Sequence, residues 1–511
     1  MMESVPLSGA LISGGDFAVL AALLALMVGV GFYFRRGQTS TDEFFLGGRK
    51  VPGWAAALSF VATEVSAVTI ISVPATAYRE NWEYLQFFIG SAAARIVIAT
   101  LFIPAFYKFN CTTIYQFLAA RFGWGTQVAA SFFFFLTRLL GSGVRLMAAC
   151  LALSVLLGWN IFPVILVFIA VGILYMGLGG MRAVVWTNVL QAAVFIVGGV
   201  AAIVFLAGKI DGGLLGLFRA ARLGGHLSIF DWGPAIGTAG FAARFFNNPN
   251  VLWVAILNGF FGSMAAFGTD QDLMQRLLTV ETRRESQRTM VATIALSLGV
   301  LLIYLTVGAG LYSFYAGHPG AILPKKADAV FPHFIGHEMP SLLKGLLLSA
   351  IVLAGIDSPL ASLATSFVTD VYRPMASRAG ILLEDRKLLA LSRICVAGFG
   401  VLLALLAWGF SFFDNILWLA FKIGGVTFGS LLGVFLLGLM TTRGRTQTNI
   451  LAMAVSALLN LGLLILSEKG ILPLGWSWLV ILGTGVTFGL GYILAPRNEG
   501  EPIAAKLYSS H

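Results

Sequence analysis

Charged residues are scarce in this chain. Only 11% of its 511 residues are Asp, Glu, Lys or Arg, whereas roughly 25% of a typical soluble domain is charged. Cysteine is rarer still, and because the three cysteines show no paired spacing they provide neither a disulfide framework nor a cysteine-rich metal centre. We find no metal-binding histidine cluster, nucleophile elbow or phosphate-binding glycine loop. These absences argue against a soluble protein and against an enzyme.

Long apolar stretches dominate the sequence instead. Hydrophobic residues make up 58% of the chain, and windows of about 19 residues predict about thirteen membrane spans. The stretches are unbroken, unlike the alternating strands of about 10 residues in a β-barrel. The sequence therefore predicts an all-α polytopic membrane protein. Residues 1–16 lack the basic region and cleavage site of a secretory signal, so we expect the first span to be retained.

The basic residues indicate the orientation of the chain. Its net charge is +10, and with the N-terminus outside, 20 of the 33 Lys and Arg residues fall in loops on the inner side. Positive charge collects on the cytoplasmic side of membrane proteins. This predicts an outside N-terminus and a cytoplasmic C-terminus in the cytoplasmic (inner) membrane. The excess of Lys and Arg over Asp and Glu is explained by this orientation, so we expect no nucleic-acid partner. The expected partners are a small-molecule solute and membrane lipid, and we expect the protein to function as a monomer.

A polar cluster interrupts the second predicted span, which contains the sequence VATEVSAVT. A charge at the bilayer centre costs at least about 2.5–3.5 kcal/mol, so Glu64 is a candidate functional residue. If the helix unwinds there, the carbonyls of Ala62 and Val65 become free to bind a hard cation while Ser66 and Thr69 face a solute. The alternative is a continuous helix whose hydroxyl groups bond back to their own backbone.

Four motifs resemble those of the sodium:solute symporter family. In chain order they read TDEFFLGGRKVPGWAAALSFVATEVSAVT, GLGGMRAVVWTNVLQ, GTDQDLMQR and FKIGGVTFGSLLGVFLLG. The resemblance implies a LeuT-like core of two inverted five-helix repeats, preceded by one helix and followed by two. It also implies a secondary active transporter that moves a small polar organic solute together with Na⁺ by alternating access.

The resemblance divides the chain into an N-terminal helix with its loop, two repeats separated by an outer loop, and a C-terminal helix pair with a short tail. The boundaries are 1–50, 51–208, 209–248, 249–440 and 441–511. The outer loop has room for interfacial helices or a lid. The tail after Pro496 is too short for an output domain, so a transporter is favoured over a transporter-derived sensor, which would need a separate partner.

Two sodium sites are implied by similarity, on the first broken helix and on the fifth and eighth core helices. Their candidate residues are Ala62, Val65, Ile351, Asn188, Asp357 and Ser358. The chain also departs from the family. Ala354 and Gly355 stand where the family has two hydroxyl residues, and Asn188 stands where it has an Asp. Hard cations need several oxygen ligands. These departures leave open a sodium-independent or proton-coupled carrier on the same fold, with Glu64 or Asp357 carrying the proton.

The solute site is placed by similarity around both broken helices. Its candidate residues are Glu64, Ser66, Thr69, Tyr84, Gln86, Arg138, Arg145 and Phe267. An arginine there is suited to clamp a carboxylate, and an aromatic ring to stack on a sugar. The competing interpretations are that Arg138 snorkels or pairs with Glu64, and that Phe267 is core packing. The solute itself is not identified, since relatives carry sugars, amino acids, carboxylates and vitamins.

A cytoplasmic gate is predicted at the inner end of the sixth core helix. Its candidate residues are Asp270, Gln271, Gln275 and Arg276. Gly259, Gly262 and Gly268 precede them and predict a second discontinuous helix, although such glycines also serve close helix packing.

Overall fold

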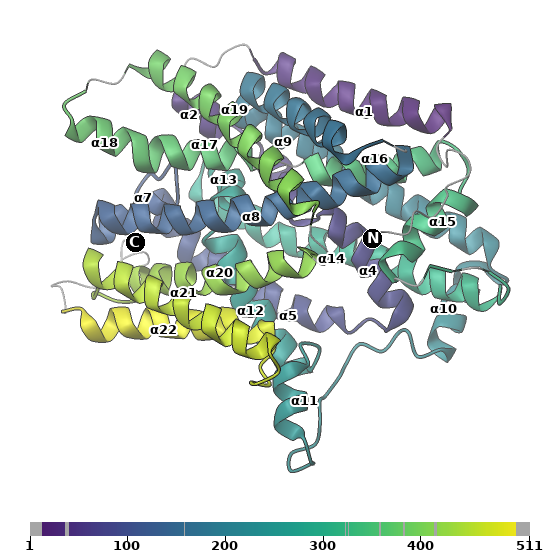
Figure 1. Cartoon of the computed structure of the whole chain (residues 1–511). Helices are drawn as coiled ribbons and strands as arrows, with labels where there is room; N and C mark the ends of the chain where they lie inside the picture. Colours follow the sequence, from purple (N-terminus) through teal and green to yellow (C-terminus); the bar gives the residue numbers. More distant parts are fainter. Residues whose placement is uncertain are drawn as a thin grey trace.

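A computed structural model describes residues 13–35, 40–157, 159–321, 323–324, 327–356, 359–381, 384–412 and 416–496. In these ranges the chain forms helices and connecting loops without a β-strand, and most long helices run roughly side by side (Figure 1). The predicted all-α class is thereby confirmed. The candidate residues Asp357 and Ser358 lie outside the described residues.

The described helices follow the predicted order. Those of the first half are α1 (Gly14–Tyr33), α2 (Thr41–Leu46), α3 (Gly53–Glu64), α4 (Ala67–Arg79), α5 (Tyr84–Val97), α6 (Ile103–Lys108), α7 (Tyr115–Phe122), α8 (Trp124–Leu157) and α9 (Ile161–Lys209). The outer segment contributes α10 (Gly213–Leu223) and α11 (Phe241–Asn247). The second half contains α12 (Leu252–Gly268), α13 (Gln271–Leu278), α14 (Arg283–Ala316), α15 (Val330–Glu338), α16 (Leu343–Ile356), α17 (Leu360–Ser366), α18 (Arg373–Arg378), α19 (Asp385–Phe410), α20 (Ile416–Met440), α21 (Thr446–Glu468) and α22 (Leu479–Leu494).

Many of these helices are long enough to cross a bilayer. Among the described residues, ten helices are long and apolar enough, and the bent pair α3–α4 would make eleven. α9 has 49 residues, more than twice the about 20 that one span needs. Gly180 interrupts it with a φ of 59°, a conformation that glycine adopts readily. The multi-pass architecture is confirmed, whereas the count of thirteen spans stays a prediction.

Close helix packing joins the two halves of the chain. α5 packs along α12 so tightly that a β-carbon at Gly90 would lie 2.0 Å from the carbonyl oxygen of Ile256. At Gly259 a β-carbon would lie 2.1 Å from the carbonyl oxygen of Phe87. Gly259 therefore serves packing, as the alternative interpretation held.

The N-terminal helix is fixed to the second half. The Asp16 side chain accepts from the Ser13 amide in the capping box of α1, and it also accepts hydrogen bonds from the backbone amides of Leu342 (3.1 Å) and Gly345 (3.0 Å) at the start of α16. Gly31 lies against the backbone of Tyr175 in α9, where a β-carbon would come within 2.6 Å of Cα. α1 is thus held by α9 and α16 at both of its ends.

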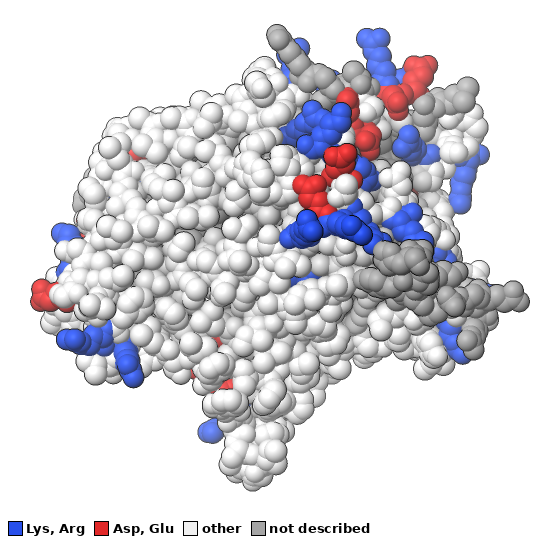
Figure 2. All heavy atoms as spheres, turned by 180° about the vertical axis from the view of Figure 1, so that it is seen from behind, with Lys and Arg blue, Asp and Glu red and all other residues white. Residues whose placement is uncertain are grey.

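Charged side chains gather at one end of the molecule. Figure 2 shows Lys, Arg, Asp and Glu concentrated near the end where α18 and the start of α19 lie, whereas the broad middle of this face is almost free of charge. A charge-poor middle is what a surface in contact with lipid acyl chains requires.

Candidate functional site

The first interruption of the core lies between α3 and α4. α3 ends at Glu64, Val65 is extended (φ −77°, ψ 107°), and the two segments are bent by 63°. In a continuous helix the Ser66 amide would donate to the Ala62 carbonyl and the Thr69 amide to the Val65 carbonyl. Instead the Ser66 amide donates to Thr69 Oγ1 (3.3 Å), and the Thr69 amide donates to Ser66 Oγ (3.4 Å). This reciprocal cap relieves both carbonyls of their helical donors, so the predicted break is confirmed.

Glu64 is neutralised by an arginine on the neighbouring core helix. Arg95 of α5 is fully buried and donates through Nη2 to Glu64 Oε1. Its Nη1 donates to Thr293 Oγ1 (2.8 Å) and Ser297 Oγ (3.1 Å) of α14, and Ser297 donates to Glu64 Oε2 (2.7 Å). Three core helices therefore meet in one network at the break. The Glu64 side chain keeps 22% exposure, which leaves it accessible to a ligand.

Phe267 of α12 belongs to the surroundings of this pair. The Arg95 guanidinium lies 4.7 Å from the centre of its ring, and Phe60 packs edge to face against it at 5.4 Å. A cation over an aromatic face is stabilised by the ring quadrupole. The Phe267 ring thus supports Arg95 as well as the core, and its predicted stacking on a solute stays a prediction.

The second interruption lies between α12 and α13, at Thr269 and Asp270. The Asp270 side chain caps α13 by accepting from the Asp272 amide (2.8 Å) and pairs with Arg138 of α8 (2.5 Å). Arg138 also lies 3.5 Å from Asp272, which pairs with Arg276 at 3.1 Å. These four charged side chains form what we call the inner polar network. The proposed pairing of Arg138 with Glu64 was wrong, because Arg138 pairs with two acids of α13 while Arg95 takes the place beside Glu64.

Two glutamines tie α13 to distant segments. Gln271 accepts from the Ile114 amide (2.9 Å) and donates to the Thr112 carbonyl (3.2 Å) in the loop before α7. Gln275 donates to the Phe45 carbonyl of α2 (2.7 Å) and to a hydroxyl of α17 (2.8 Å). All four predicted gate residues are buried in this region. Their function as a gate stays a prediction.

Asn188 of α9 links the two interruptions. In the amide orientation that gives each atom a complementary partner, its oxygen accepts from Ser59 Oγ (3.2 Å) and Arg276 Nη2 (3.3 Å), and its nitrogen donates to the Val184 carbonyl (3.2 Å). The side chain is fully buried between α3 and α13. Asp357, which we expect from the sequence to face Asn188, lies outside the described residues.

The structure gives a steric reason for one family departure on α16. A β-carbon at Gly355 would lie 2.1 Å from Cβ of Ala149 on α8, so a serine does not fit without movement of that helix. Ala354 and Ile351 are both buried on the same helix. Close contact between α8 and α16 therefore occupies the space that a side chain at position 355 would need.

The remaining predicted solute residues are dispersed. Gln86 is fully buried, accepts from the Asp231 amide (3.0 Å) and donates to the Asn250 carbonyl (2.8 Å), so it anchors the outer loop to the start of α12. A solute contact there would require these bonds to break. Tyr84 is 41% exposed, and Arg145 is exposed on α8.

A buried acid near the other end of the bundle escaped prediction. Asp370 accepts hydrogen bonds from Gln127 Nε2 (2.7 Å), Ser131 Oγ (3.0 Å), Ser366 Oγ (2.5 Å) and Thr113 Oγ1. Charge-assisted hydrogen bonds of this kind stabilise a buried carboxylate. The cluster fastens α8, α17 and the loop before α7 to one another.

Comparisons with known proteins agree with this geometry. The model of the "Sodium:solute symporter family" matches residues 44–455. The chain is 29% identical over 458 residues to the sodium/sialic acid symporter SiaT of Proteus mirabilis, covering 86% of this chain and 88% of that one. It is 28% identical over 434 residues to sodium-coupled monocarboxylate transporter 2 of Danio rerio, covering 83% and 68%.

Solved structures show the same fold. A substrate-bound, outward-open Na⁺-coupled sialic acid symporter superposes with a TM-score of 0.83 at 24% identity, covering 95% of this chain and 100% of that one. The nucleobase-cation symporter Mhp1 in a closed conformation gives 0.56 at 15% identity, covering 91% and 97%. Together with the family match, these relatives favour sodium coupling over the proton-coupled alternative. The chain is a multi-pass membrane transporter, and it belongs to the sodium:solute symporter family.

Proposed function

We propose that this symporter binds Na⁺ and a small polar carboxylate together near the break between α3 and α4 and moves them inward by alternating access. The observation that carries the proposal is the reciprocal cap of Ser66 and Thr69, which frees two carbonyls beside the Glu64–Arg95 pair. Interrupted helices near the membrane midplane are typical of ion and solute sites in transporters.

The proposed primary Na⁺ site uses backbone oxygens. The carbonyls of Ala62 and Val65 face it from the first break, and the carbonyl of Ile351 faces it from α16. Because Ala354 and Gly355 have no hydroxyl groups, we infer that water completes the oxygen shell that a hard cation needs. A bound Na⁺ then bridges α3 and α16 in the solute-competent state, so that ion binding raises solute affinity by linkage.

A second Na⁺ site, next to Asn188, rests on sequence similarity. The proposed ligands are Asp357 and Ser358, with the Asn188 amide as an oxygen ligand. Within this arrangement Asn188 contributes no charge of its own, so Asp357 supplies the negative charge that offsets Na⁺.

The proposed solute is a carboxylate with further hydrogen-bonding groups. Sialic acid and monocarboxylates, named for relatives at 29% and 28% identity, share this chemistry. At the first break, Arg95 is the nearest guanidinium for the carboxylate, and Glu64 accepts from hydroxyl or amino groups. The further proposed solute contacts are Ser66, Thr69, Tyr84, Gln86, Arg138, Arg145 and Phe267. Asp270, Gln271, Gln275 and Arg276 close the inner side.

We infer an outside N-terminus, a cytoplasmic C-terminus and a functional monomer in contact with membrane lipid. The orientation is supported by α1 beginning and α22 finishing at opposite ends of the bundle (Figure 1), and by the charged end in Figure 2. The proposed inverted repeats are residues 51–208 and 249–440, each beginning with one of the two interrupted helices.

Uptake into proteoliposomes tests this function. Radiolabelled N-acetylneuraminate and lactate are offered with an imposed Na⁺ gradient, and separately with a pH gradient in Na⁺-free buffer. We expect Na⁺-dependent accumulation of at least one solute. Undiminished uptake without Na⁺ would overturn sodium coupling, and Na⁺-driven uptake confined to uncharged solutes would overturn the carboxylate class.

A further inference from the structure

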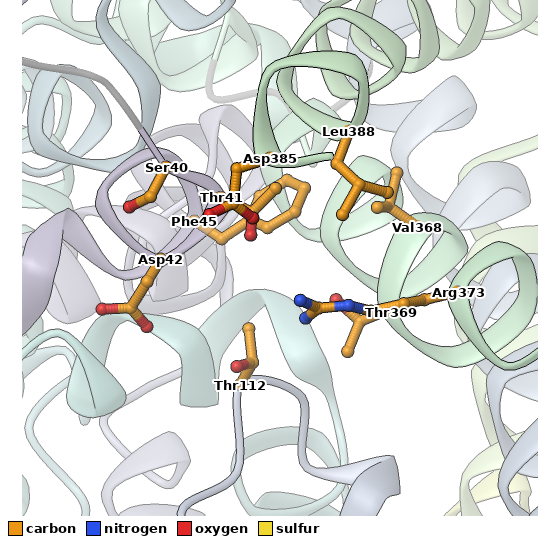
Figure 3. Close-up of a pocket in the computed structure, with 10 residues that line it drawn as sticks. All are labelled: Ser40, Thr41, Asp42, Phe45, Thr112, Val368, Thr369, Arg373, Asp385 and Leu388. Carbon is orange, nitrogen blue, oxygen red and sulfur yellow. The ribbon is translucent and has the colours of Figure 1, made fainter. Parts of the chain in front are cut away.

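A polar cavity that the transport site does not use lies at the charged end of the molecule. Its volume is about 200 Å³, and its walls come from α2, the loop before α7, the π-helical segment Phe367–Tyr372 with the start of α18, and the start of α19 (Figure 3). They come from three separate regions of the sequence, 40–45, 112 and 368–388, so no local motif predicts the cavity.

Three charged side chains line this cavity without neutralising one another. Arg373 extends into it from one side, whereas Asp42 and Asp385 lie on other walls (Figure 3). Among the described residues, no ion pair joins Arg373 to either acid. A cavity with separated positive and negative groups is complementary to a ligand that has an anionic end and hydrogen-bond donors elsewhere.

Hydroxyl groups also line the cavity between these charges. Thr41, Thr112 and Thr369 face the cavity (Figure 3). A guanidinium suits a carboxylate because it offers two parallel donors, and the two aspartates accept from hydroxyl or amino groups. The volume lies below the roughly 300–1,000 Å³ of sites for drug-sized ligands, so a small solute is favoured.

We propose that this cavity is a second binding station for the transported solute, occupied on the cytoplasmic side after release from the central site. Arg373 holds the carboxylate, while Asp42 and Asp385 accept from the donor groups. This inference rests on the proposed function, because it takes its ligand class from there.

The cavity is connected directly to the inner half of the second broken helix. Gln271 of α13 donates to the carbonyl of Thr112 (3.2 Å), and Gln275 donates to the carbonyl of Phe45 (2.7 Å). Both acceptors belong to residues that line the cavity. A displacement of α13 therefore moves two walls, and occupancy of the cavity in turn biases the position of α13 by linkage.

The test measures solute affinity from each side of the membrane. Proteoliposomes are prepared in which the protein has one defined orientation. Exchange of radiolabelled N-acetylneuraminate and of lactate is then measured while the solute concentration is varied on one side of the membrane at a time. Arg373→Gln should raise the KM at the α18 face about tenfold or more, as expected for losing a charged hydrogen-bond donor, and leave the KM at the opposite face unchanged. Arg373→Lys should recover part of the loss because the charge remains.

Arg378→Gln is the matched control. Arg378 lies on the same short helix, stacks 3.9 Å above the ring of Trp124 and does not line the cavity, so its replacement should leave both KM values unchanged. Equilibrium dialysis of the purified protein gives a second measure, in which Arg373→Gln should reduce two bound solutes per chain to one.

The outcomes separate the inference from the proposed function. Unchanged KM values in Arg373→Gln, or one bound solute in the wild type, overturn the second station while Na⁺-driven uptake persists. Equal losses at both faces overturn it as well, since they would indicate a general structural effect. If the wild type binds neither carboxylate at the α18 face, the inference fails for this solute class whatever drives uptake.

Discussion

The two interrupted core helices solve the same structural problem with different chemistry. At the α3–α4 break, hydroxyl groups cap the helix, and one acid, Glu64, meets one base, Arg95. At the α12–α13 break, an acid caps the helix, and Asp270 and Asp272 meet Arg138 and Arg276. The first arrangement leaves two carbonyls without their helical donors and part of a carboxylate exposed, whereas the polar groups of the second are paired within the protein. One break is therefore suited to bind ligands and the other to hold helices together.

Removing the arginine of the first break should have the largest effect on stability. Arg95→Gln leaves the Glu64 carboxylate without its counter-charge and should cost about 3–5 kcal/mol, as for other broken buried ion pairs. Thermal unfolding of the purified protein measures the loss, with the exposed Arg145→Gln as control.

The double variant Glu64→Gln with Arg95→Met shows whether Arg95→Gln lowers stability by breaking the ion pair or by removing the packing of the Arg95 side chain. It should regain most of the stability because neither charge remains, while Na⁺-driven uptake should stay impaired. A double variant as unstable as Arg95→Gln alone would show that the pair contributes mainly through the bulk of Arg95.

The second break should respond with a smaller loss and a different functional change. Arg138→Gln removes the arginine partner of Asp270 and leaves Asp272 with Arg276 alone, which should cost about 2–3 kcal/mol. We expect a Na⁺ leak without solute, measured by ²²Na⁺ flux, because α13 is held less firmly. A variant that is destabilised but does not leak would contradict the assignment of this break to closure.

The contact of α8 with α16 provides a further test of the region near the first break. Gly355→Ser should cost about 1–3 kcal/mol by overpacking against Ala149, and Ala149→Gly in the same chain should restore stability. Unfolding temperatures measure both changes. Gly398→Ser is the control, since a β-carbon there meets nothing within 4 Å.

The restored double variant also tests the ion site. With a serine hydroxyl returned to position 355, we expect the Na⁺ concentration for half-maximal uptake to fall, because the cation gains an oxygen ligand. An unchanged value in a stable double variant would place the ion away from Gly355.

The smallest effect is expected at the cap of α4. Ser66→Ala should cost about 1 kcal/mol, the usual value for a lost N-cap, and should raise the Na⁺ concentration needed for half-maximal uptake. Without Ser66 Oγ, the Thr69 amide becomes free to donate to Val65 and compete with the ion. Thr282→Ala, which removes the cap of α14, should cost as much without changing Na⁺ dependence; equal Na⁺ shifts in both would refute the role of the freed carbonyls.

The sequence predicted the breaks better than their partners. The hydroxyl groups and the acid within one apolar span were enough to locate the first interruption, because such groups are costly in lipid. The pairing of Glu64 with Arg95 depends on how α3, α5 and α14 meet, and no spacing along the chain encodes that meeting. Arg95 had a visible signal, a lone basic residue inside a span, but its partner required the fold.

The positions at which the chain departs from the family pattern also show that contacts between helices could not be predicted from the sequence. Gly355 reads in the sequence as a missing ligand, whereas in the fold it lies where α8 leaves no room for a β-carbon on α16. Gln86 similarly carries the residue type expected of a solute contact, but backbone groups of the outer loop engage both ends of its amide. Residue type was informative at both positions, and tertiary contact decided the role.

The attachment of α1 has a practical consequence for following the transport cycle. Because Asp16 accepts from backbone amides at the start of α16 and Gly31 fits against α9, we expect α1 to move together with these helices. A donor fluorophore on an exposed position of α1, with an acceptor on the α12–α13 region, would therefore report displacements of α16 relative to that region by energy transfer. Such a reporter lies on the periphery and leaves every proposed ligand of Na⁺ and solute unmodified.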